Sequence, residues 1–191
     1  MLVVEPQVEF ETDGSFYARV GGRPATDFVN TVAWIGTSEE FDWLADSRRL
    51  SDWVSTSGAD GARADYRIVR VVRARIDAVL RPLATGGAPH ATAVQRLNDL
   101  VRRASARRVM DARTWSWTTT TKNSSSLFDF VVLDAAELIV GSDRALLRAC
   151  PGCGWLFVDR SRTRGRRWCV MSSCGNRAKA KSHYYRHRDA R

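Results

Sequence analysis

The sequence predicts a mainly helical α+β protein, in which a helical N-terminal domain with a small β-sheet precedes a C-terminal treble-clef-like zinc finger. Apolar residues recur at helical spacing through residues 65–104, β-forming residues cluster at 107–121, and all four cysteines follow residue 149. We place the domains at residues 1–145 and 146–191. A body of about 150 residues can bury a sufficient core, whereas about 40 residues usually need a metal or disulfides.

The first third of the chain is expected to hold a hairpin and two helices. Residues 7–20 alternate around Asp13-Gly14, which is typical of a β-hairpin. Residues 26–35 are expected to form a short helix or a helix entry. Residues 39–57 carry apolar side chains at helical spacing, with Ser38 as a candidate N-cap and Gly58 just past the end. Residues 58–64 are expected to be a loop.

The sequence pattern in the middle of the chain predicts three helices and one or two strands. Residues 65–83 form an amphipathic pattern, and we expect their arginines to face water. Residues 85–89 break this helix, and residues 93–104 predict the next. Residues 107–121 contain two tryptophans and four threonines in a row, which favours strands. Residues 127–140 predict a mostly apolar, buried helix.

The cysteines stand as Cys150-x2-Cys153, then fifteen residues, then Cys169-x4-Cys174. Two thiolate pairs around a short loop are typical of a structural zinc site, so we expect one Zn²⁺ held by all four sulfurs. A redox Cys-x2-Cys pair is the alternative, but it lacks the βαβ context of such motifs. Four thiolates leave no open coordination position, which argues against a catalytic metal.

The residues around the cysteines predict the rest of the finger. Gly152 and Gly154 let backbone N–H groups turn toward sulfur. Residues 155–158 predict a short strand, residues 159–167 an arginine-rich loop, and residues from about 176 to 188 a helix. His183 and His187 stand four apart on this helix and could bind metal as a pair. Because four thiolates already satisfy zinc, we expect these histidines to face solvent or phosphate.

The positive charge is confined to the cysteine-containing segment. Residues 150–191 hold eleven Arg or Lys against two Asp, a net charge of +9, whereas the first 149 residues hold nineteen of each sign. Such a density attracts polyanions, and nucleic acid is the commonest. A solubilising or disordered tail is the alternative, which the tryptophans and cysteines of the segment argue against.

Several motifs of the chain carry a family resemblance. They are Cys150-x2-Cys153, Trp155-x-Phe157-x-Asp159-x-Ser161, Arg166-Arg167-Trp168-Cys169, Met171 and Cys174-Gly175-Asn176-Arg177-x-Lys179. Together they resemble the CGNR zinc-finger family. Bacterial proteins of this family join the finger to an N-terminal ABATE domain, and Asp27-Phe28-Val29-Asn30-Thr31 resembles the Asp-Phe-x-Asn-Thr signature near its start. The resemblance implies a stress-induced transcriptional regulator or, in other descriptions, an RNA-binding protein.

We expect the tail helix and the preceding loop to form one phosphate-binding surface, with one or two side chains reaching base edges. In the alternative, Asn176 caps the helix and Arg177 pairs with Asp159. Trp155 and Trp168 are expected to pack over the zinc rather than stack on bases. The candidate nucleic-acid-binding residues are Arg160, Arg162, Arg164, Arg166, Arg167, Asn176, Arg177, Lys179, Lys181, Tyr184 and Arg188.

The N-terminal domain offers one candidate ligand pocket. Arg23, Asp27, Asn30 and Thr31 lie near apolar residues in the sequence, as in a site for a small-molecule effector. In the alternative, which we favour, Asp27 and Asn30 cap and pin a helix start. A homodimer is compatible with the sequence.

The sequence favours a regulator over an enzyme. The body has a single histidine, His90, and no glycine-rich phosphate motif. The N-terminus lacks the features of a signal peptide, and no apolar run approaches the ~20 residues of a membrane span. We therefore expect a cytoplasmic, zinc-dependent, DNA-binding transcriptional regulator. RNA binding, or a protein-interaction adaptor with a purely structural zinc finger, are the alternatives.

Overall fold

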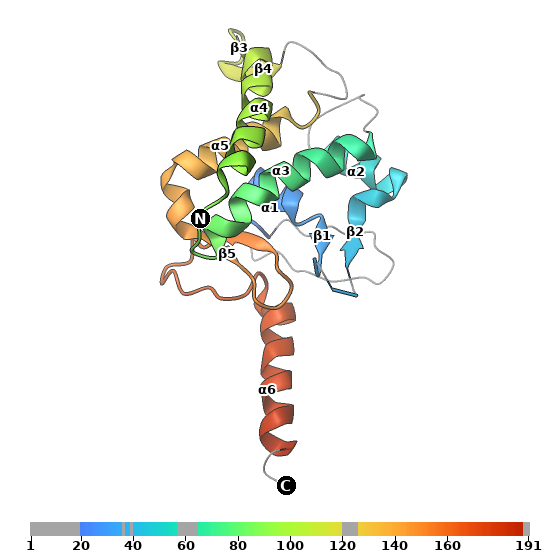
Figure 1. Cartoon of the computed structure of the whole chain (residues 1–191), viewed down its shortest axis with the longest axis vertical. Helices are drawn as coiled ribbons and strands as arrows, with labels where there is room; N and C mark the ends of the chain where they lie inside the picture. The colour runs from blue at the N-terminus through green and yellow to red at the C-terminus, as the bar shows by residue number, and fades with distance from the viewer. Residues whose placement is uncertain (1–19, 36, 39, 57–64, 120–125, 189–191) are drawn as a thin grey trace.

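The computed structural model describes residues 20–35, 37–38, 40–56, 65–119 and 126–188. Three predicted segments lie outside these residues. They are the hairpin at 7–20, of which only residue 20 is described, the loop at 58–64 and the end of the threonine run. The predicted fold class is confirmed. Helices form the body, and the strands of the described residues pair into two-stranded antiparallel sheets (Figure 1).

The N-terminal elements begin with helix α1 (Pro24–Val29), where Pro24 occupies the first turn and needs no N–H partner. Strand β1 (Val32–Ala33) pairs with β2 (Phe41–Asp42), followed by the 3₁₀ turn η1 (Trp43–Ala45) and helix α2 (Ser47–Thr56).

The helix predicted over residues 39–57 is therefore wrong in its first part, and Ser38 is not its N-cap. A long-range hydrogen bond and a local cap override the helical spacing there. The Trp43 N–H donates to the Thr31 carbonyl at 2.9 Å, and the Asp42 side chain caps η1 through the Leu44 N–H at 3.0 Å. The helix begins only at Ser47.

Three longer helices build the core of the body. They are α3 (Tyr66–Ala84), α4 (Ala91–Arg107) and α5 (Asp129–Val140), close to the predicted ranges. Asp65 caps α3 by accepting a hydrogen bond from the Arg67 N–H at 2.8 Å. The centre of this core contains Phe28, Val69, Ile76, Leu80, Val131 and Leu138, none of which is more than 1% exposed.

One arginine of α3 does not face water as predicted. Arg73 is only 7% exposed. Its guanidinium donates to the Thr31 hydroxyl at 2.8 Å and pairs with Asp42, which also accepts a hydrogen bond from Tyr66 at 2.7 Å. Burial, followed by the hydrogen bond to Asp42, raises the pKa of Tyr66. This buried network joins α3 to the β1–β2 pair.

The predicted strands after α4 form a hairpin, in which β3 (Arg108–Asp111) pairs with β4 (Ser116–Thr119). The hairpin stands at one end of the molecule and helix α6 (Asn176–Arg188) at the other (Figure 1). None of the helices in the described residues combines the length and the apolar character that a bilayer span needs.

The finger follows the predicted order of knuckle, hairpin, loop and helix. A 3₁₀ helix, η2 (Ser142–Leu146), leads into β5 (Leu147–Ala149), which pairs with β6 (Leu156–Val158) across the first cysteine pair. After the loop, a π-helical turn, η3 (Met171–Gly175), continues into α6. Helix α6 has no buried residue and extends away from the rest of the protein (Figure 1).

The finger and the helical body share their cores. Leu147, Leu156 and Val158 of the finger belong to the same buried cluster as the body helices. In return, Ala33 and Trp43 of the body lie in the buried cluster that contains the four cysteines. The boundary predicted between residues 145 and 146 thus runs through a continuous packing interface.

Candidate functional site: a metal centre beside a basic helix

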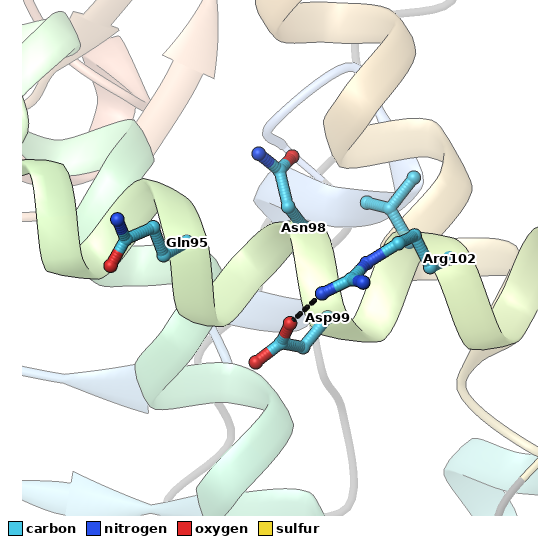
Figure 2. Close-up of a pocket in the computed structure, with 5 residues that line it drawn as sticks. Gln95, Asn98, Asp99 and Arg102 are labelled. Carbon is cyan, nitrogen blue, oxygen red and sulfur yellow. Dashed lines mark hydrogen bonds and ion pairs between the residues drawn. The ribbon is translucent and has the colours of Figure 1, made fainter.

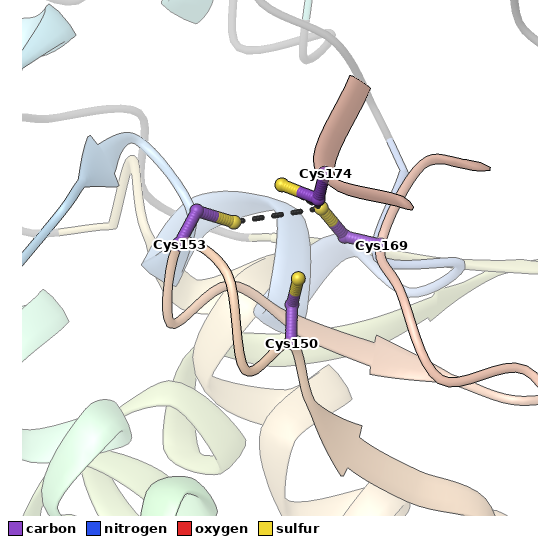
Figure 3. A group of neighbouring side chains, drawn as sticks. All are labelled: Cys150, Cys153, Cys169 and Cys174. Carbon is purple, nitrogen blue, oxygen red and sulfur yellow. Dashed lines mark hydrogen bonds between the residues drawn. The ribbon is translucent and has the colours of Figure 1, made fainter. Parts of the chain in front are cut away.

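The four cysteine sulfurs converge at the junction of the knuckle, the loop and η3 (Figure 3). All four residues are buried, and their sulfurs lie within 4.8 Å of one another. The Sγ atoms of Cys153 and Cys169 are 3.5 Å apart, and those of Cys169 and Cys174 are 3.6 Å apart. Tetrahedral zinc with Zn–S bonds of ~2.3 Å requires sulfur separations of about 3.8 Å, so the geometry fits one zinc ion.

The electrostatics of the cluster also favour a bound cation. Contact with the Cys150 sulfur raises the pKa of Cys169, and burial raises it further. The same contact raises the pKa of Cys153. Four thiolates so close together in a buried site cannot all be ionised unless a metal neutralises them.

Glycines shape the knuckle around the first cysteine pair. The Gly154 N–H donates to the Cys150 carbonyl at 2.9 Å, in a turn that gives Gly154 a φ of 77°, where a side chain would be strained. A Cβ on Gly152 would lie 3.3–3.4 Å from Cys174 and Trp168, so a methyl group there would crowd the ligand. The backbone N–H of Trp155 is hydrogen-bonded to the Cys153 sulfur and favours its thiolate form, as predicted for an N–H that supports a ligand.

Each residue of the Cys-Gly-Asn-Arg motif has an internal contact. Cys174 is a ligand, and a Cβ on Gly175 would displace the Met171 side chain and lie 3.2 Å from Trp168. Asn176 donates to the Ser172 carbonyl at 3.1 Å. The Arg177 guanidinium donates to the Ser173 hydroxyl at 3.1 Å and lies 3.8 Å from the Cys174 sulfur. A cation beside a thiolate stabilises the ligand's charge.

Asp159 is not the partner of Arg177. Its buried carboxylate accepts hydrogen bonds from the Ser161 N–H at 3.0 Å, the Ser161 hydroxyl at 2.6 Å and the Arg166 N–H at 3.0 Å. Burial by itself raises the pKa of Asp159, but the hydrogen bonds from Ser161 and Arg166 outweigh burial and lower it. The carboxylate therefore fixes both ends of the arginine-rich loop.

We expect Asp159→Asn to lower the free energy of unfolding by about 2 kcal/mol, because the amide cannot accept at every position where the carboxylate does. Since the folded pKa lies below the usual ~3.9, the carboxylate's contribution is complete above about pH 4 and is lost as pH falls through the lowered value. Denaturant unfolding should give the same difference from wild type at pH 8 and pH 5. Asp99→Asn, on the exposed face of α4, is the matched control with a small effect. A difference that changes between these pH values contradicts the prediction.

The predicted nucleic-acid-binding residues fall into two groups. Arg160 pairs with Asp143 at 2.5 Å, and the Arg166 guanidinium binds the Trp168 and Cys169 carbonyls and lies over Phe157. These two arginines, with Asn176 and Arg177, have structural contacts within the protein. Of these four, Arg160, Asn176 and Arg177 are nevertheless exposed. The other members, all exposed, are Arg162, Arg164, Arg167, Lys179, Lys181, Tyr184 and Arg188.

The tryptophans of the finger face inward. Trp155 is 2% exposed, its ring lies 5.9 Å from that of Trp43, and its indole N–H donates to the Val32 carbonyl at 2.9 Å. Trp168 is half-buried against the glycines of the zinc site. Trp155 thus anchors the finger to the body.

All four residues of the predicted ligand pocket have partners inside the protein. Arg23 pairs with Asp134 at 2.7 Å, and Asp27 accepts a hydrogen bond from the Gly21 N–H at 2.8 Å. The Thr31 hydroxyl donates to the Phe28 carbonyl at 2.6 Å. The Asn30 amide exchanges two hydrogen bonds with the backbone of Leu156. These contacts agree with the alternative, in which the residues have structural roles. Asn30, however, holds the finger through Leu156 and does not cap the start of a helix.

A surface hollow lies elsewhere, on the outer side of α4 (Figure 2). Gln95, Asn98, Asp99, Val101 and Arg102 line it, and an Asp99–Arg102 ion pair spans one turn of the helix. A single helix contributes all these residues, so the hollow lacks the enclosing walls of a ligand site.

One residue between the helical body and the finger was not predicted from the sequence to have a role there. Arg81 of α3 donates to the Gly154 carbonyl at 2.7 Å and pairs with Asp77 at 2.7 Å. It holds the zinc knuckle against the body. The spacing of Asp77 and Arg81 predicts their ion pair, but no sequence signal indicates the contact with Gly154.

The fold and the site define a helical protein that carries a closed, four-cysteine zinc finger. Residues 22–142 match the ABATE family model, described as "Putative stress-induced transcription regulator", and residues 147–187 match the CGNR zinc finger. The first match spans more than half of the chain, so the protein belongs to the ABATE family, joined to a CGNR finger as its motifs predicted. A search of curated proteins found no match. The finger binds one structural zinc ion through its four cysteines.

Proposed function

We propose that this protein is a DNA-binding transcription regulator, without enzymatic activity, whose zinc finger presents α6 to nucleic acid. One observation carries the proposal: α6 has no buried residue and holds five Arg or Lys and no Asp or Glu over 13 residues. A helix without a buried residue gains little from packing, and a surface with charges of one sign suits a polyanionic partner.

The dimensions of α6 suit a duplex. Thirteen residues extend about 20 Å, and the major groove of B-DNA, about 12 Å wide, admits one helix. Zinc supports this arrangement because Cys174 anchors the start of the helix and Cys169 the end of the arginine-rich loop. Lys181, Tyr184 and Arg188 share a stripe at helical spacing and are the side chains we expect to meet phosphates or base edges.

RNA binding is the alternative within the same surface, because exposed cations bind either backbone. The description of the ABATE family as transcription regulators favours DNA. The structural contacts of Arg23, Asp27, Asn30 and Thr31 give no support to an effector, and we propose that the N-terminal domain orients the finger.

The nucleic-acid surface is tested by Lys181→Ala combined with Arg188→Ala. We expect the double variant to bind duplex DNA about tenfold more weakly in 0.1 M salt, because two phosphate contacts are lost. About six phosphate contacts give the wild type a slope of log K against log salt near −5, and the variant's slope should be shallower by about 2. Fluorescence anisotropy with labelled duplex measures both quantities.

Arg103→Ala is the matched control, because Arg103 is an exposed arginine on a body helix. It should bind like the wild type. A wild-type slope near zero, or equal losses in the control and the double variant, contradicts binding through α6. Tighter binding of single-stranded RNA than of duplex at the same salt favours the RNA alternative.

A further inference from the structure

We infer a second metal site on α6, where His183 and His187 chelate a divalent transition-metal ion of the imidazole-binding class. The two residues stand one helical turn apart, and both are exposed. Their Nε2 atoms are 3.0 Å apart and their ring centroids are 4.2 Å apart, so the two rings lie on the same side of the helix. Both nitrogens thus face a common point in solvent.

The separation of the nitrogens indicates the kind of ion. Metal–imidazole bonds of ~2.0–2.1 Å at a right angle place two nitrogens about 2.9 Å apart, and a tetrahedral angle places them about 3.4 Å apart. The observed 3.0 Å fits adjacent positions of a square-planar or octahedral ion. Ni²⁺ and Cu²⁺ prefer such geometry and bind imidazole well.

The histidine pair is already arranged for binding. An N–H···N hydrogen bond between the rings accounts for the same 3.0 Å separation. A metal takes the place of the shared hydrogen, and the proton of the donor ring moves to its Nδ1 atom, so neither side chain moves far. From sequence alone we expected these histidines to face solvent or phosphate. The measured distance adds the chelating geometry that residue spacing cannot show.

The second site is separate from the structural zinc. His183 follows Cys174 by nine residues, which is about 13 Å along a helix. The cysteine site is closed by four sulfurs, whereas two imidazoles leave positions open for water or for a donor atom of a partner. An ion at this site is therefore expected to exchange more easily than the zinc.

Such an ion would act on the helix itself. Isolated helices as short as α6 are marginally stable in water, and α6 has no buried residue that packing could stabilise. An ion that links His183 to His187 holds one turn of the helix in place. Lys179 and Arg186 stand three or four residues from a histidine, so their charges oppose a cation and weaken the site.

The test is isothermal titration calorimetry, in which Ni²⁺ is added to the full-length, zinc-loaded protein in a non-coordinating buffer. We expect one Ni²⁺ per chain beyond the resident zinc. His183→Gln and His187→Gln should each weaken binding about tenfold or more, because a single ring loses the high local concentration of the second. Lys179→Gln should bind Ni²⁺ more tightly. Amide exchange at residues 183–188 should slow on addition of Ni²⁺ in the wild type but not in the His183→Gln and His187→Gln variants.

The third histidine of the chain supplies the control. His90→Asn keeps an N-cap acceptor for α4, and it should bind Ni²⁺ like the wild type. Absence of Ni²⁺ binding, equal affinity in the His183→Gln variant, or loss of binding in His90→Asn would each overturn the inference. A Lys179→Gln variant that binds no more tightly contradicts placement of the ion on this face of the helix.

Discussion

Removal of zinc, or replacement of Cys153 by serine, is expected to unfold the finger and to destabilise the helical body with it. Structural zinc contributes on the order of 10 kcal/mol or more in small fingers. This is comparable to the whole stability of a typical domain, about 5–15 kcal/mol. The finger cannot be lost alone, because Leu147, Leu156 and Val158 fill the core between the body helices.

Three measurements check this expectation. Metal analysis should find one zinc per chain, thermal unfolding of the chelated protein should show a large loss of melting temperature, and hydrogen exchange should lose protection at residues 147–158. Protection in α3 should fall as well, since Arg81 and the shared core connect α3 to the knuckle.

Ser172→Ala is the matched control for the cysteine variant, because Ser172 is exposed and lies two residues from a ligand. It should retain zinc and the wild-type melting temperature. A chelated protein that keeps its melting temperature and its protection at residues 147–158 contradicts a structural role for the ion.

The metal centre and the long helices could be predicted because their signals are local. Zinc coordination fixes the number and spacing of Cys150, Cys153, Cys169 and Cys174, and no distant contact is needed to recognise the pattern. The apolar spacing of residues 65–83 and 93–104 likewise specifies α3 and α4 within about three residues of their ends.

The remaining features depend on partners far away in the sequence. Nothing near Asp42 in the sequence indicates that it will bind Arg73, and the helical spacing of residues 39–57 was misleading. Arg73 looks like the other arginines of α3, yet Thr31 and Asp42 hold it inside. Arg166 likewise belongs to an arginine-rich loop and still binds the backbone beneath it. Residue type alone cannot separate a buried, satisfied arginine from an exposed one.

Asn30→Ala is expected to lower the free energy of unfolding by about 3 kcal/mol. The Asn30 side chain is 1% exposed and acts as a strand partner for the backbone of Leu156. Its Nδ2 donates to the Leu156 carbonyl at 2.8 Å, and its Oδ1 accepts from the Leu156 N–H at 2.8 Å. Alanine leaves a buried donor and a buried acceptor without a partner, and each such group costs about 1–3 kcal/mol.

Urea denaturation of Asn30→Ala beside Asn98→Ala measures this effect. Asn98 is exposed on α4, so its substitution should stay within about 0.5 kcal/mol of wild type. Leu156 follows the zinc knuckle directly, so Asn30→Ala should also release zinc to a chelator faster than the control. This second readout separates the two roles considered for Asn30. A residue that pins the finger affects both stability and zinc release, whereas a residue reserved for a small ligand leaves both unchanged, and that outcome would overturn the structural role.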